Sequence, residues 1–195
     1  MPTMASQPSI DELSDLVLLL LAEAKKRGMS SVAGTTRLQK LVFLLSRTPD
    51  YRRLVESGQA PQVEFRPYRM GPFTPALYEA VELLSEFEPP LIVTTDEADK
   101  QSALEWDEYL DEVDIDRSEP SATSAPRPTE YSLTSDGDYV ATALARDAPS
   151  DLRQAIGRVI AAFGTMGLRQ LLRSVYQDYP EYTTRSEIRE ELGLR

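Results

Sequence analysis

The chain has 195 residues, of which 41% are apolar and 27% charged, and its formal net charge is −11 at pH 7. It contains no cysteine and no histidine, which excludes disulfides, thiolate or imidazole metal sites and Ser-His catalytic triads. We therefore expect a non-enzymatic protein that uses no cofactor and is large enough to bury one core.

Charge is unevenly distributed along the sequence. Residues 25–72 contain ten basic and three acidic residues, whereas residues 96–119 contain eleven acidic and two basic residues. The longest apolar run, residues 16–22, is far shorter than the ~20 residues that cross a membrane, and the N-terminal residues lack the basic region of a signal peptide. We expect a cytoplasmic protein that does not associate with membranes.

Two helices are predicted before residue 50. A capping box at residues 9–12 starts the first, which ends near Arg27 with Gly28 in the C′ position. Thr36 and Gln39 form the spacing of a second capping box, and Pro49 lies just beyond the end of that helix. Residues 62–69 alternate between apolar and polar side chains, which predicts a short strand at a sheet edge.

A third helix is predicted at Thr74, because Thr-Pro supplies an N-cap followed by proline. The side chains expected on its buried face are Leu77, Tyr78, Val81, Leu84 and Phe87.

Residues 91–95 and 130–134 are predicted to form the two strands of a hairpin that carries a long insertion. Ser135 is expected to cap the next helix, which bears Tyr139 among its apolar positions. Two amphipathic helices follow from Ser150, separated by glycines, and Thr184 begins the spacing that predicts a short final helix.

This order of elements predicts an α+β, mostly helical fold: a winged helix-turn-helix-like core with a C-terminal helical extension. We divide the chain into an N-terminus without fixed structure (1–9), a winged-helix-like domain (10–148) and the helical extension (149–195). The domain contains an acidic, Pro- and Ser-rich insertion at 96–129, whose second half has the composition of a disordered segment.

Several motifs resemble those of the Panacea (SocA-like antitoxin) and YwgA-like families. They are TTRLQKLVFLL, FRPYRMGPF with its Thr-Pro helix start, the YSLTSDG strand and the ending LLRSVYQDYPEYTTRSEI. The resemblance covers roughly residues 10–95 and 130–190. It implies a winged-helix-like core without a catalytic centre, and a role as an antitoxin or protease adaptor that binds a protein partner. The acidic insertion departs from the family pattern and argues against a conventional DNA-contacting wing.

The basic residues of 25–72 have two interpretations: contacts to phosphates, or solvated surface charges that pair with the acidic insertion. Similarly, Tyr68 and Phe73 belong either to a ligand-contacting loop or to a tight turn packed into the core. The acidic segment 96–119 is either a solubilising linker or a lid over the basic face. The candidate binding residues are Arg37, Lys40, Arg47, Arg66, Tyr68, Arg69 and Phe73.

A protein partner is the favoured interpretation. The helix predicted at 74–87 would be the recognition helix of a winged helix, and it carries Glu79, Glu82 and Glu86 but no lysine or arginine. Phosphates would repel such a surface. The alternative is a DNA-binding transcriptional regulator, with phosphate contacts from Arg37, Lys40, Arg66 and Arg69. Homodimerisation remains open.

Overall fold

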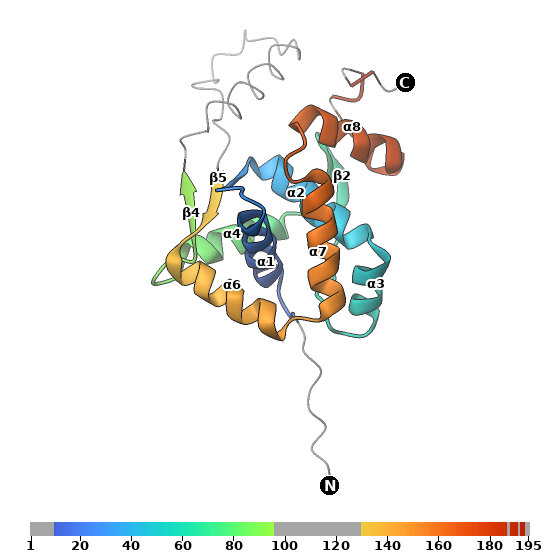
Figure 1. The fold of residues 1–195 in the computed structure, drawn as a ribbon. Helices are drawn as coiled ribbons and strands as arrows, with labels where there is room; N and C mark the ends of the chain where they lie inside the picture. Colours follow the sequence, from blue (N-terminus) through green and yellow to red (C-terminus); the bar gives the residue numbers. More distant parts are fainter. Residues whose placement is uncertain (1–9, 96–129, 187, 191, 194–195) are drawn as a thin grey trace.

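The computed structural model describes residues 10–95, 130–186, 188–190 and 192–193, and the fold is α+β and mostly helical (Figure 1). The helices of the described residues are α1 (Leu13–Lys26), α2 (Thr35–Arg47), α3 (Pro49–Glu56), α4 (Ala76–Glu86), α6 (Ser135–Asp147), α7 (Ser150–Phe163), α8 (Leu168–Asp178) and the 3-10 helix η1 (Pro180–Thr183). The strands are β1 (Val32–Ala33), β2 (Arg66–Tyr68), β3 (Gly71–Phe73), β4 (Ile92–Thr95) and β5 (Glu130–Leu133).

Helix α1 lies in the middle of the molecule, packed against α4, α6 and α7 (Figure 1). Its side chains are buried without interruption from Leu16 to Ala22. Such all-round burial is typical of a core helix rather than of an amphipathic surface helix. The helix begins at Leu13 with Glu12 in the N-cap position and no side-chain capping bond. The expected capping box is therefore not the start of the helix, and its Ser9 lies outside the described residues.

The sheet beside α1 is three-stranded and antiparallel, in the order β1-β5-β4. Val32 lies opposite Tyr131, and Ile92 lies opposite Leu133. The hairpin predicted from residues 91–95 and 130–134 is confirmed by this pairing. The insertion at 96–129 and the N-terminus at 1–9 lie outside the described residues, so the expectations for both stay predictions.

The corner between β5 and α6 is closed by Thr134. Its hydroxyl accepts a hydrogen bond from the Gly137 amide at 2.9 Å and donates to the Pro90 carbonyl at 2.7 Å. The N-cap is thus Thr134, one residue before the predicted Ser135. Gly137 packs so tightly that an added Cβ would lie 1.8 Å from the Leu91 carbonyl oxygen.

Helix α3 was not predicted, because we read Pro49 only as a stop signal for the helix before it. Thr48 Oγ1 accepts from the Tyr51 amide at 3.3 Å, and Pro49 occupies the first position of the new helix. The sequence predicted this N-cap and proline arrangement at Thr74 instead. That prediction was wrong in detail, because α4 begins at Ala76 with Pro75 in the N-cap position and no side-chain capping bond.

The two C-terminal helices carry the predicted apolar stripes, and both are confirmed. Helix α7 packs against α1, α2 and α3, and α8 packs against α2. The core is one cluster to which both the N-terminal and the C-terminal helices contribute. After η1, the described residues form turns rather than the predicted final helix.

None of the helices among the described residues is both long enough and apolar enough to cross a membrane.

Candidate functional site

A group of exposed side chains gathers on the β2–β3 hairpin and the first turn of α4. In the hairpin, Arg66 lies opposite Phe73 and Tyr68 lies opposite Gly71. The alternation predicted for residues 62–69 is confirmed, because every second side chain from Gln62 to Tyr68 is exposed and those between are half-buried. The hairpin therefore presents one face to the interior and the other to solvent.

Three aromatic rings and one guanidinium make up what we call the hairpin surface: Arg66, Tyr68, Phe73 and Tyr78. The ring centroids of Tyr68 and Phe73 are 4.8 Å apart, and those of Phe73 and Tyr78 are 5.9 Å apart. The Arg66 guanidinium carbon lies 5.5 Å from the centre of the Phe73 ring, within the range of a cation–π contact. The half-buried Phe73 ring thus holds the Tyr68 and Tyr78 rings in place, and both of these are exposed.

Tyr78 is the member of this surface that the sequence placed wrongly. We expected Tyr78 and Phe87 on the buried face of their helix, but 52% and 49% of their surfaces are exposed. Helix α4 instead buries Leu77, Ala80 and Leu84. Partial burial among its neighbours raises the pKa of the Tyr78 hydroxyl, and the nearby Tyr68 raises it further.

Gln39 of α2 supports the hairpin surface through hydrogen bonds to the backbone of Thr74. Its side-chain Nε2 donates to the Thr74 carbonyl at 2.7 Å, and its Oε1 accepts from the Thr74 amide at 3.0 Å. Both residues are 2% exposed. Gln39 therefore pairs both backbone groups of the residue that joins β3 to α4, and it does not form the capping box predicted with Thr36.

Gly71 begins β3 in a backbone conformation that only glycine adopts readily, with φ of +85°. A Cβ at this position would also lie 2.6 Å from Cε1 of Tyr176 in α8. The Tyr176 hydroxyl in turn lies 2.9 Å from the Ser186 hydroxyl. The hairpin thus rests against the C-terminal helix through a contact that leaves no room for a side chain at Gly71.

Lys40 lies in the interior rather than on a basic surface. It is 2% exposed, and its ammonium donates to the Pro72 carbonyl of β3 at 3.0 Å. Within the described part of the chain, no carboxylate is close enough to form an ion pair with it. Burial lowers the pKa of Lys40 from 10.5 to about 7. Its function in the fold is to bind β3 to α2.

Arg37 is likewise buried, with 7% of its surface exposed. Its Nε donates to the Ala33 carbonyl at 3.3 Å, and its Nη1 donates to the carbonyls of Gly164 and Met166. These bonds join α2 to β1 and to the turn between α7 and α8. As folded, neither Arg37 nor Lys40 is a solvated surface charge, and neither is available to a partner.

Arg47, also a predicted binding residue, is half-buried beside an aromatic cluster. Its guanidinium carbon is 4.6 Å from the Phe43 ring centre and 5.1 Å from that of Tyr182, and Nη2 donates to the Tyr182 hydroxyl at 2.7 Å. Its Nε is buried without a hydrogen-bond partner in the described residues. Arg47 therefore covers the junction between α2 and η1.

Of the seven predicted binding residues, the structure brings Arg66, Tyr68 and Phe73 together, with Arg66 and Tyr68 exposed and Phe73 half-buried between them. Arg69 is exposed at the turn of the same hairpin. Sequence reasoning missed Tyr78, because helical periodicity alone assigned it to the core. The signal that could have identified it is its position one turn after a hairpin with two aromatic residues.

The described residues contain no group of three or more acidic side chains that could bind a metal ion. Comparisons with protein-family models, with curated proteins and with solved structures gave no match.

Proposed function

We propose that this protein is a non-enzymatic regulatory module of winged-helix type that uses its hairpin surface to bind a protein partner, as an antitoxin or adaptor does. The observation that carries the proposal is the hairpin surface itself: contiguous tyrosine and phenylalanine rings with an arginine, accessible yet rigidly supported. Interfaces between proteins are enriched in these residue types, and their binding energy concentrates in such side chains.

The order of the elements supports the winged-helix part of the proposal. Winged-helix domains follow the order helix, strand, helix, helix, strand, strand, and their last strand lies between the first two. Here α1, β1, α2, α4, β4 and β5 occur in that order, and the sheet order is β1-β5-β4. In this assignment α3 and the β2–β3 hairpin are additions between the second and third helices.

The charge of α4 favours a protein over DNA. In the winged-helix assignment α4 is the recognition helix, and its exposed side chains include Glu79, Glu82 and Glu86. The alternative function, a DNA-binding regulator, loses two of its four expected phosphate contacts because Arg37 and Lys40 are buried. Arg66 and Arg69 are the exposed basic residues that still favour it.

The proposal is tested by comparing partner capture across three proteins. Wild type, a Tyr68→Ala/Tyr78→Ala variant and a Tyr139→Ala control would each be immobilised and exposed to lysate of the native host. Tyr139 is a matched control because it is 79% exposed on α6, away from the hairpin. We expect a partner that binds wild type and the control equally and is lost from the double variant, because truncating a hot-spot tyrosine typically costs more than 1 kcal/mol.

The same proteins would be titrated with the DNA upstream of the gene across a salt series. Sequence-specific binding that weakens steeply with salt and disappears in Arg66→Ala/Arg69→Ala would establish the DNA-binding alternative. Capture that is unaffected by the tyrosine substitutions would remove the hairpin surface from the proposal.

A further inference from the structure

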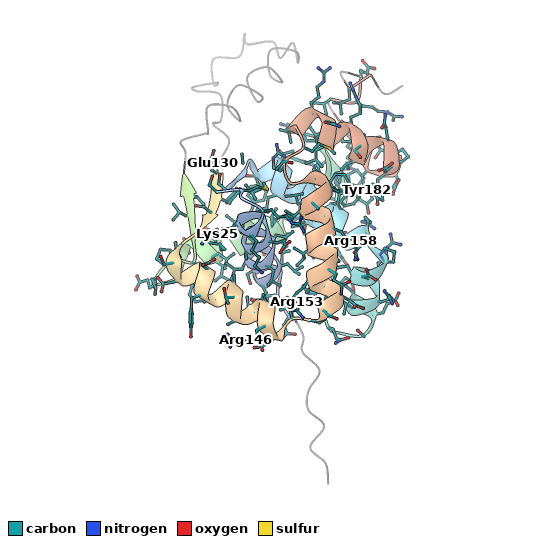
Figure 2. The ribbon with its side chains drawn as sticks, in the orientation of Figure 1. Lys25, Glu130, Arg146, Arg153, Arg158 and Tyr182 are labelled. Atoms are coloured by element: carbon teal, nitrogen blue, oxygen red, sulfur yellow. The ribbon has the colours of Figure 1, made fainter. Side chains whose placement is uncertain are left out.

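Two grooves lie side by side along α1, one facing α7 and the other facing α6. The first offers about 530 Å³ and the second about 600 Å³, and Arg153 lines both. Six cations surround them, which we call the basic trough: Lys25, Lys26, Arg27, Arg146, Arg153 and Arg158. Figure 2 shows four of these, Lys25, Arg146, Arg153 and Arg158, along the face formed by α1, α6 and α7.

Half of these cations already have a carboxylate partner. Lys25 Nζ is 3.1 Å from Asp138, Arg27 Nε is 2.8 Å from Glu23, and Arg158 pairs with Asp50 of α3. These pairs hold their side chains along the rim of the trough.

The other three, Lys26, Arg146 and Arg153, are exposed, and their side chains form no ion pair or hydrogen bond in the described part of the chain. Among the described residues, these three cations have no carboxylate partner, and they lie beside a double groove that a ligand could occupy.

The lining of the trough combines positive charge with small side chains. Six cations face three carboxylates: Glu23 and Asp138 in the lining, and Asp50, which pairs with Arg158. The trough therefore carries a net charge of about +3. The whole chain carries −11. Between the cations the floor is formed by alanines of α1 and α6 and by Gly157 of α7. Such a floor lets the main chain of a ligand approach the helices closely.

We infer that the basic trough binds an acidic peptide segment, a short run of Asp and Glu in another protein. Its negative charges would pair with Lys26, Arg146 and Arg153, and its main chain would lie on the small-residue floor. A nucleic acid fits less well, because the residues that line the two grooves include no aromatic ring on which a base could stack. This surface differs from the hairpin surface in position and in chemistry, and it does not depend on the proposed function.

The test measures binding of a labelled, Glu-rich synthetic peptide to the full chain by fluorescence anisotropy at low and at physiological salt. Wild type is compared with a Lys26→Ala/Arg146→Ala/Arg153→Ala variant. We expect about a tenfold loss of affinity in the variant at low salt, and a smaller difference at physiological salt because exposed charges are screened.

A second triple variant, Arg52→Ala/Arg173→Ala/Arg185→Ala, is the matched control. These three arginines are exposed, lie outside both grooves and change the net charge by the same amount. An independent variant, Thr142→Glu, adds a carboxylate to the α6 side of the trough without removing any cation. It should also weaken binding of the Glu-rich peptide.

Three results would overturn the inference. The first is that wild type does not bind the peptide at low salt. The second is that both triple variants lose the same affinity, because the effect would then come from net charge alone. The third is that a single-stranded DNA oligonucleotide of equal charge binds the trough more tightly than the peptide does, which would assign the trough to nucleic acid.

Discussion

The hairpin surface and the basic trough are built in opposite ways. The hairpin surface is aromatic and depends on buried polar contacts, since Gln39 and Lys40 reach from α2 to hold the backbone on either side of Phe73. The trough is cationic and is formed by side chains of α1, α6 and α7, with one ion pair to Asp50 of α3. The comparison teaches that basic residues of one stretch of sequence can have opposite positions. Arg37 and Lys40 are buried, whereas Lys25, Lys26 and Arg27 line the trough together with arginines of α6 and α7.

The substitution with the largest expected effect on stability should disrupt the hairpin and leave the trough intact. Gly71→Ala should lower the free energy of unfolding by about 3 kcal/mol, because it combines a left-handed backbone with a collision against Tyr176. Urea denaturation measures the loss, and binding of the Glu-rich peptide to the folded fraction should be unchanged.

Gly58→Ala is the matched control for that substitution. Gly58 has a comparable φ of +70°, but a Cβ there meets no atom within 4 Å. It should cost only about 1 kcal/mol, the penalty of the left-handed conformation alone. Equal losses at the two glycines would mean that Tyr176 moves aside at no cost and does not fix the hairpin.

A smaller effect separates the polar support of the hairpin from its packing. Gln39→Met keeps the volume of the side chain but leaves the Thr74 amide and carbonyl buried without partners. We expect a loss of about 2 kcal/mol in the free energy of unfolding, together with faster hydrogen exchange at the Thr74 amide. Gln154→Met on the exposed face of α7 is the control and should change stability by less than about 0.5 kcal/mol. A Thr74 amide that stays fully protected would show that packing around Thr74, and not its hydrogen bond to Gln39, protects it from exchange.

The smallest effect concerns pH and the buried Lys40. Because its pKa falls from 10.5 to about 7 on folding, the unfolded chain binds more protons than the folded protein between these values. Stability should therefore rise with pH across this window, by about 1 kcal/mol between pH 7 and pH 8. Lys40→Met should lose this rise, as measured by urea denaturation at each pH. An identical pH dependence in the two proteins would contradict the burial of a titrating ammonium.

Patterns that depend on local periodicity were predictable from the sequence. The stripes of α7 and α8 and the alternation of residues 62–69 follow from which side chains face the core. These inferences need only the spacing of residues within one element. The pairing of β4 with β5 across a long insertion was also predicted, from two segments with strand-forming residues on either side of it.

The polar contacts between elements could not be predicted in this way. Gln39 has the spacing of a capping residue relative to Thr36, yet its amide is used by Thr74, 35 residues away. Lys40 looks like a surface charge until β3 is known to cover it. Tyr78 and Tyr139 are aromatic at helical spacing, but 52% and 79% of their surfaces are exposed, and the ring that Tyr78 does contact belongs to Phe73 of β3. Only the tertiary arrangement decides such positions.

The pairing of Thr95 with Glu130 has a consequence for how this fold tolerates change. Directly paired residues on neighbouring strands are only about 5 Å apart, so the 34 residues between them leave and rejoin the sheet at nearly the same point. The free energy of closing such a loop grows only slowly with its length. The tip of this hairpin is therefore a place where whole segments can be gained, lost or exchanged while the helical core stays the same.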